Sequence, residues 1–271
     1  ITPAVADRTG LAPATTVVAV GSHDTASAVV GIPARNRKIA YVSSGTWSLV
    51  GVELDEPVLT EAARTANFTN EGGVDGRVRF LRNVGGLWLL QESVRVWRED
   101  GETVDLDALL AEAAALPSGG PVVDVDAEVF LAPGDMPERI RSFCRDRGTD
   151  LPEEPAAVVR CILDSLAVAY ARTMEQAAAL SGVVPEVVHI VGGGSRNELL
   201  CQLTADLSGL PVESGPVEAT ALGNLIVQAR TAGALAGDLE DLRRTVRASS
   251  TLKRYRPAPA ATEHELSSST R

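Results

Sequence analysis

Cysteine and histidine are scarce in this sequence, and both shortages exclude classes of protein. The 271 residues include three cysteines and three histidines. Three cysteines without paired spacing make neither a disulfide framework nor a zinc finger, so a reducing, cytoplasmic setting is expected. The histidines lack ligand spacing, which argues against a metal site held by the protein. Whether Cys144 and Cys161, near the ends of two predicted helices, meet is left open by the sequence.

Long apolar runs and dense basic stretches are missing as well. No apolar run reaches about 18 residues, so no membrane span is predicted, and no signal peptide is recognised at the start. The formal charge is −11, which argues against a nucleic acid as partner. The most basic stretch, residues 242–256, is expected to be a solvated helix face. Binding of a small phosphorylated molecule is not excluded, because local hydrogen-bond donors, rather than the net charge of the chain, decide it.

The first part of the chain has the pattern of a β-meander. Residues 15–20 (TTVVAV) are predicted to form a buried strand, and residues 24–31 a short helix of small side chains. Residues 37–54 then predict a hairpin that turns at Ser44-Gly45-Thr46. Residues 65–84 predict a second hairpin, whose Gly- and Asp-rich turn tolerates positive φ angles.

Helices follow, and then strands and helices alternate. A helix is predicted over residues 85–100 from the spacing of its apolar side chains. Further helices, with Asp or Pro at their starts or Gly at their ends, are predicted over residues 105–116, 135–148 and 155–182. The last third predicts strand 186–191, helix 196–209, strand 211–214 and helix 218–233. This alternation is typical of parallel strands covered by helices. We therefore expect one α/β domain over residues 1–252 and a flexible tail over residues 253–271.

A triple-glycine turn, Gly192-Gly193-Gly194, ends a predicted strand and opens a helix. Glycines let the backbone approach a ligand, and a helix start offers unpaired N–H donors. A tight crossover without a ligand is the alternative. The turn lacks the spacing of a dinucleotide fingerprint and the lysine of a P-loop, so a Rossmann-type enzyme is disfavoured. Ala219, Ala221 and Gly223 are interpreted as leaving room beside this turn for a flat group.

Small polar side chains mark three further places. The hairpin tip at residues 43–46 carries hydroxyls and turn amides, which can bind phosphate oxygens, although an ordinary polar turn fits too. Asn83 and Gln91 offer uncharged amides suited to sugar hydroxyls or a nucleobase. Asp24 follows His23 too closely for a Ser-His-Asp triad. It suits a helix N-cap and equally a base that faces a substrate hydroxyl.

Four of these segments, in this order, resemble the C-terminal half of a carbohydrate kinase of the FGGY family. They are GSHDTASAV, SSGTWSLVG, NEGGVDGRVRFLRNVGGLWLLQE and HIVGGGSRNELLCQLTADLSGLPV, and the resemblance covers residues 15–235. It implies an actin-like, ribonuclease-H-like ATPase fold and in-line phosphoryl transfer from ATP to a small sugar. Members that phosphorylate L-rhamnulose at its 1-hydroxyl are the most similar. A kinase for another ketose or polyol, such as L-fuculose or D-xylulose, and a non-catalytic ATP-binding regulatory module remain alternatives.

The resemblance also implies a role for each candidate residue. Asp24 would be the catalytic base, and the sugar would contact His23, Asp24, Thr25 and Asn83. The nucleotide would contact the hairpin tip, the following helix and the glycine turn, at Gly45, Thr46, Gln91, Gly192, Gly193 and Gly194. Mg²⁺ would arrive with ATP and need few protein ligands.

One part of the family pattern has no counterpart here. Family members carry a first domain with an Asp-x-Gly motif that helps to hold Mg-ATP and supplies much of the sugar pocket. DRGT at residues 146–149 looks similar but is interpreted as a helix stop. We therefore expect this chain to be a C-terminal domain whose partner is that N-terminal domain. Alone it is expected to be inactive and to bind nucleotide weakly, with a Kd of roughly millimolar.

Overall fold

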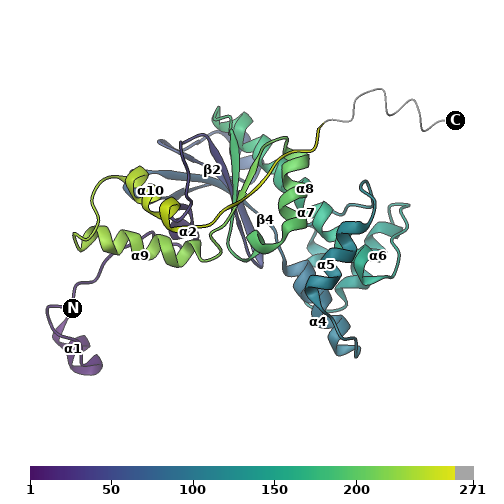
Figure 1. Cartoon of the computed structure of the whole chain (residues 1–271), viewed down its shortest axis with the longest axis horizontal. Helices are drawn as coiled ribbons and strands as arrows, with labels where there is room; N and C mark the ends of the chain where they lie inside the picture. The colour runs from purple at the N-terminus through teal and green to yellow at the C-terminus, as the bar shows by residue number, and fades with distance from the viewer. Residues whose placement is uncertain (260–271) are drawn as a thin grey trace.

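A single mixed β-sheet with helices on both faces forms the body of the chain (Figure 1). The computed structural model describes residues 1–259. The strand order across the sheet is β3-β4-β2-β1-β5-β6-β7. The strands are β1 (Ile39–Ser44), β2 (Trp47–Leu54), β3 (Thr69–Gly72), β4 (Val78–Gly85), β5 (Val187–Val191), β6 (Val212–Ser214) and β7 (Lys253–Tyr255). β1 joins the two halves, because it pairs antiparallel with β2 and parallel with β5. The predicted meander followed by parallel strands is confirmed.

Most helices begin and end where local signals predicted. They are α1 (Pro3–Thr9), α2 (Asp24–Val30), α3 (Glu61–Thr65), α4 (Trp88–Glu99), α5 (Leu106–Ala115), α6 (Met136–Arg145), α7 (Pro155–Ser181), α8 (Glu198–Ser208), α9 (Ala219–Thr231) and α10 (Leu239–Ser249). The Asp105 and Asp135 side chains cap α5 and α6. Gly182 ends α7 in the left-handed conformation, with φ 75°. No helix among residues 1–259 is long and apolar enough to cross a membrane.

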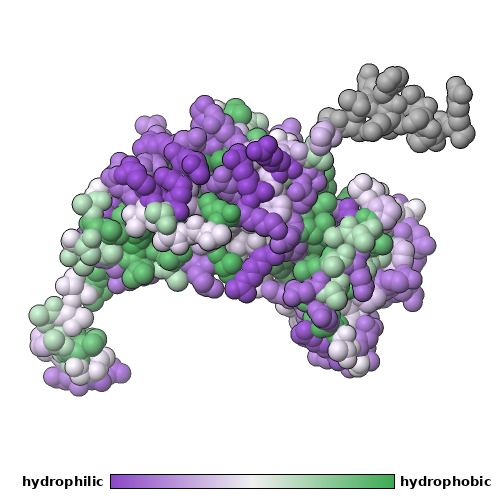
Figure 2. All heavy atoms as spheres, in the orientation of Figure 1, coloured by the Kyte–Doolittle hydropathy of each residue, from purple (hydrophilic) through white to green (hydrophobic). Residues whose placement is uncertain are grey.

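Side-chain alternation along the strands gives the sheet two different faces. Tyr41 and Leu81 belong to the apolar cluster under α2, whereas Val42 and Val50 belong to the larger core that includes α7. On the α7 face the Tyr170 hydroxyl lies 2.5 Å from the Ser48 hydroxyl. Figure 1 shows α2, α9 and α10 on one side of the sheet and the layer of α4, α5 and α6 beyond α7. Figure 2 shows hydrophobic residues reaching the surface around α9, where Leu225 is exposed.

Two predicted segments differ in the structure. Residues 15–20 do not form a strand, and Val17 is 79% exposed. A strand needs a pairing partner, but this segment runs from α1 to α2 without joining the sheet, so its β-branched residues alone do not suffice. The flexible tail expected from residue 253 is wrong for residues 253–255, which form β7 beside β6. Residues 260–271 lie outside the described part of the chain.

The basic stretch at residues 242–256 is not simply a solvated face. The Arg243 side chain on α10 is fully buried and donates to both carboxylate oxygens of Glu53 on β2, at 2.8 and 3.2 Å. The buried residues of α10 on the same side, Leu239, Leu242 and Val246, turn Arg243 inward onto the sheet. The pairing partner lies far away in the sequence, so local charge could not reveal it. The three cysteines are buried and free, so Cys144 and Cys161 form no disulfide here.

Candidate active site

A cavity of about 640 Å³ lies on the α2 side of the sheet, beside the tip of the β1–β2 hairpin. Segments far apart in the sequence meet there: the start of α2, the hairpin tip, β3, β4, the glycine turn and the start of α9. Among its lining residues are the sequence-predicted His23, Asp24, Thr25, Gly45, Thr46, Asn83, Gly192 and Gly193. The fold therefore brings most of the predicted site residues into one space.

Asp24 is the first residue of α2, and His23 rather than Asp24 occupies the N-cap position. The Thr25 backbone N–H donates to His23 Nδ1 at 3.2 Å and to Asp24 Oδ1 at 2.7 Å. Among the described residues, Asp24 Oδ2 has no hydrogen-bond partner, and the side chain is 77% exposed. One carboxylate oxygen is thus held by the backbone and the other is open to a ligand.

Close packing against α9 positions α2, and with it Asp24, beside the cavity. A Cβ on Gly223 would lie 1.8 Å from the Ser27 carbonyl oxygen, and one on Gly31 would lie 2.2 Å from the Ala219 carbonyl oxygen. The two helices therefore touch backbone to backbone. The interpretation that Ala219 and Gly223 leave room for a flat group is wrong, because both positions pack against α2. Thr220, which the sequence did not single out, lines the cavity instead.

The hairpin tip is tied to the start of α4. The Leu87 N–H donates to the Gly45 carbonyl at 2.9 Å, and the Trp88 N–H donates to the Thr46 carbonyl at 3.1 Å. The Thr46 hydroxyl donates to Gln91 Oε1 at 3.2 Å. Gln91 is not itself a lining residue of the cavity. Gln91 reaches the cavity only indirectly, through its hydrogen bond with the lining residue Thr46.

The glycine turn packs against the same hairpin. Gly192 has a φ of 82°, and a Cβ there would lie 2.8 Å from the Ser44 carbonyl oxygen. Gly194 is buried, and a Cβ there would lie 2.0 Å from Ser44 Oγ, so its role in the structure is close packing rather than lining. A Cβ on Gly193 would meet nothing within 4 Å. Gly193 is therefore the point at which the turn faces open space.

Sequence reasoning missed the lining residues Trp47, Leu49 and Glu71. Glu71 on β3 lies opposite Arg79 on β4, and their side chains form an ion pair at 2.9 Å. Its segment was interpreted as the approach to a turn. Alternation along β4 could have placed Arg79 and Asn83 on one face, but only the strand register adds Glu71 to it.

The lining carries negative charge, and Glu71 shares its charge with Arg79, which does not itself line the cavity. The lining holds two carboxylates, Asp24 and Glu71, and no lysine or arginine among the residues described. Within residues 1–259 there is also no cluster of three or more His, Cys, Asp or Glu side chains that could hold a metal ion. A phosphate group bound here would need a cation that comes with it, so the donor set fits a magnesium ion carried by its nucleotide.

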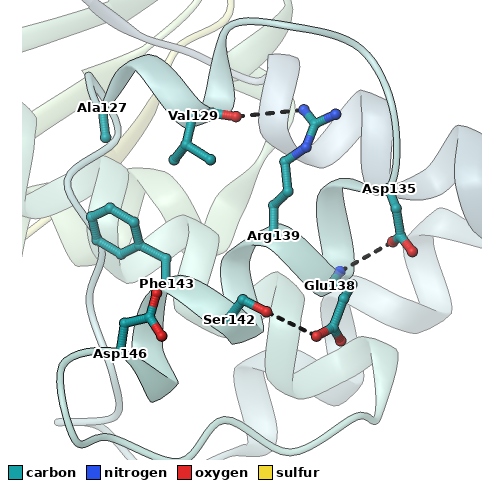
Figure 3. A pocket seen from close by; sticks show the side chains of 8 residues that line it. All are labelled: Ala127, Val129, Asp135, Glu138, Arg139, Ser142, Phe143 and Asp146. Atoms are coloured by element: carbon teal, nitrogen blue, oxygen red, sulfur yellow. Dashed lines mark hydrogen bonds between the residues drawn. The ribbon is translucent and has the colours of Figure 1, made fainter.

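A second cavity, of about 540 Å³, lies between residues 127–129 and α6 (Figure 3). Four of its five polar side chains, Asp135, Glu138, Arg139 and Ser142, are hydrogen-bonded within the protein. The Ser142 hydroxyl donates to Glu138 at 2.9 Å, and Arg139 donates to the Pro133 carbonyl at 2.8 Å. Asp135 accepts from the Glu138 N–H at the start of α6. This cavity therefore offers little to a ligand, and the cavity at Asp24 is the candidate site.

Comparisons with known proteins agree on one family. Residues 40–232 match the C-terminal domain of the FGGY family of carbohydrate kinases. The chain is 45% identical over 261 residues to a rhamnulokinase of Bacteroides thetaiotaomicron, covering 96% of this chain and 53% of that protein. It is 47% identical over 243 residues to a rhamnulokinase of Klebsiella pneumoniae, covering 90% of this chain and 49% of that protein. The chain thus spans about half the length of the curated relatives it matches.

Solved structures of sugar kinases share the fold. A xylulose kinase from Rhodospirillum rubrum superposes with a TM-score of 0.67 at 18% identity, covering 97% of this chain and 51% of that one. A glycerol kinase from Plasmodium falciparum, solved with ADP, gives a TM-score of 0.61 at 14% identity, covering 91% of this chain and 48% of that one. The predicted actin-like, ribonuclease-H-like fold is confirmed.

Proposed function

This chain belongs to the FGGY family of carbohydrate kinases, and from that premise we propose that it is the C-terminal domain of an ATP-dependent sugar kinase. Its identity to proteins named rhamnulokinase favours L-rhamnulose as the acceptor, with L-rhamnulose 1-phosphate as the product. The observation that carries the proposal is the single cavity that unites Asp24, the hydroxyl-bearing hairpin tip and the glycine turn.

Asp24 acts as the general base in this proposal. Its Oδ1 accepts from the Thr25 N–H, which leaves Oδ2 to accept the proton of the attacking sugar hydroxyl. The freed oxygen attacks the terminal phosphorus of ATP, the bond to the bridging oxygen breaks, and ADP leaves. A positioned base contributes roughly 10²–10⁴-fold. His23, Thr25 and Asn83 hold the sugar on the same side of the cavity.

The nucleotide occupies the other side of the cavity. Gly45 and Thr46 at the hairpin tip hold the terminal phosphates, with Gln91 fixing the Thr46 hydroxyl. Gly193 contacts the adenosine, because the turn faces open space there. Mg²⁺ that arrives with ATP neutralises phosphate charge, which the lining residues themselves do not do.

A second domain closes the cavity in this proposal. The Asp24 side chain is 77% exposed, and phosphoryl transfer to a sugar rather than to water needs an enclosed site. The relatives are about twice as long as the matched region. We infer that an N-terminal domain supplies the opposite wall and much of the sugar pocket. The 271-residue chain alone is expected to bind nucleotide weakly and to turn over no sugar.

An ATP-dependent coupled assay tests the proposal on the chain joined to its N-terminal domain. We expect a strong preference for L-rhamnulose over L-fuculose, D-xylulose and glycerol, and a loss of at least about 10²-fold in Asp24→Asn. Asp107→Asn is the matched control, because Asp107 also lies in the first turn of a helix, α5, but outside the cavity.

Each outcome of that assay addresses one part of the proposal. If the enzyme prefers another sugar and Asp24→Asn abolishes that activity, the role of Asp24 as base would stand and the proposed substrate would be wrong. Full activity in Asp24→Asn would refute the base. ATP binding without turnover of any sugar would favour a regulatory module. Turnover by the 271-residue chain alone would show that no second domain is needed.

A further inference from the structure

We propose that Glu71 recognises the hydroxyl groups on carbons 4 and 5 of the sugar, remote from the reacting 1-hydroxyl, and so determines which ketose is accepted. The inference rests on the sugar kinase function proposed above and adds a specificity-determining residue to that same site. Glu71 lines the cavity together with Asp24 and Asn83.

The strand register places Glu71 at one end of the cavity floor. Trp47, beside the hairpin tip, pairs with Gly85 on β4, whereas Glu71 pairs with Arg79 on the same strand. Those two positions are six steps apart along β4, about 20 Å at the usual rise of a strand, and Asn83 lies between them. The phosphates lie at the tip in our proposal. A six-carbon sugar is much shorter than that separation, so it occupies only part of it. Held at Asn83 with its reacting hydroxyl toward the tip, the sugar directs its carbons 4 and 5 toward Glu71.

The Glu71 carboxylate is ordered but not saturated. Arg79 Nη2 lies 2.9 Å from Oε2, and the Thr69 hydroxyl donates to Oε1 at 3.3 Å. A carboxylate accepts about four hydrogen bonds, so both oxygens keep acceptor capacity. The Glu71 side chain is 30% exposed, and that exposed part faces the cavity. Sugar hydroxyls are donors of the kind these oxygens can accept.

Arg79 holds this carboxylate in place before any sugar arrives. The Arg79 side chain is 2% exposed, and its Nε donates to the Gly72 carbonyl at 3.2 Å. A preorganised acceptor loses little conformational entropy when it binds. Arg79 also balances the charge of Glu71, so the cavity gains a strong acceptor without an unbalanced charge that would repel the phosphates of ATP.

Two epimeric sugars and two substitutions test the inference in the complete kinase. L-rhamnulose and L-fuculose differ in configuration at carbon 4, far from the reacting 1-hydroxyl. We expect Glu71→Gln to reduce the ratio of their kcat/KM values by about 10- to 100-fold and to leave the KM for ATP unchanged. Glu71→Asp keeps the charge beside Arg79 but withdraws it by one methylene. It should lose the same discrimination while keeping the thermal stability of the wild type.

Glu61→Gln is the matched control, because Glu61 also pairs with an arginine, Arg64 on α3, but does not line the cavity. It should leave the ratio unchanged. An unchanged ratio in Glu71→Asp, or an equal loss on both epimers, would overturn the inference and leave Glu71 as a support for the sheet. A wild type that phosphorylates no sugar would overturn the proposed function itself, which is a distinguishable result.

Discussion

Removal of the Arg243 guanidinium is expected to destabilise the fold by several kcal/mol. Arg243 is fully buried and donates to both oxygens of Glu53, whose side chain is 4% exposed. It also donates to the Val29 carbonyl at the end of α2, at 2.9 Å. In Arg243→Met the apolar stem remains and the charge is lost. Among residues 1–259 the buried carboxylate then keeps only the Arg77 guanidinium, whose Nε lies 4.0 Å away.

The magnitude follows from the burial. Removing one partner of a buried ion pair costs about 3–5 kcal/mol, because the other charge stays behind without compensation. The whole domain is stable by on the order of 5–15 kcal/mol. Since about 1 kcal/mol shifts Tm by about 2–4 °C for a domain of this size, Tm should fall by roughly 6–20 °C.

Thermal and urea unfolding of the 271-residue chain, followed by circular dichroism, measure this loss. Arg244→Met is the control, because Arg244 is the next residue of α10 but is 69% exposed and pairs with Asp241 at the surface. Its free energy of unfolding should change by less than about 1 kcal/mol. The double variant with Glu53→Gln should recover part of the loss. An Arg243→Met chain as stable as Arg244→Met would refute the reasoning.

Three further predictions concern packing, pH and thiol reactivity. Gly223→Ala should reduce the free energy of unfolding by about 1–3 kcal/mol, because its Cβ would lie 1.8 Å from the Ser27 carbonyl oxygen; unchanged urea unfolding would contradict the backbone contact. Burial lowers the pKa of His189 to about 3. The unfolded chain takes up that proton near pH 6.5 and the folded chain does not, so stability should fall by up to about 1.4 kcal/mol per unit as the pH drops below 6.5. In His189→Gln the free energy of unfolding, measured by urea titration, should depend less on pH below 6.5. The same pH dependence as in the wild type would contradict the role of His189. Burial also raises the pKa of Cys201 to about 12 and that of Cys161, so iodoacetamide should label the cysteines only after unfolding, which mass spectrometry can follow; rapid labelling of the native chain would contradict their burial.

Features that depend on neighbours in the chain were predictable from the sequence. The caps Asp105 and Asp135 and the glycine that ends α7 act within one helical turn, so their residues reveal them directly. The hairpin at Gly45 is equally local. That Asp24, Thr46 and Gly193 meet in one cavity followed from the family resemblance, and the structure places them there.

Features that depend on long-range pairing were not predictable. Residues 15–20 have strand-forming side chains but no partner, whereas residues 253–255 pair with β6 despite their position near the end of the chain. Arg243 lies in a basic stretch, yet its partner Glu53 is 190 residues away. Glu71 enters the cavity only through the register of β3 on β4. In each case the deciding contact lies between elements rather than within one.

The backbone contact between α2 and α9 has a mechanical consequence. Asp24 begins one of these helices and Thr220 lies in the first turn of the other, and both line the cavity. Because no side chain separates the helices at Gly31 and Gly223, a shift or rotation that brought a larger residue into this contact would push the helices apart. The distance between Asp24 and Thr220 at the cavity is therefore set by the packing of these two helices. In the kinase that we propose, the motion that admits sugar and releases product then occurs between this helix pair and the N-terminal domain.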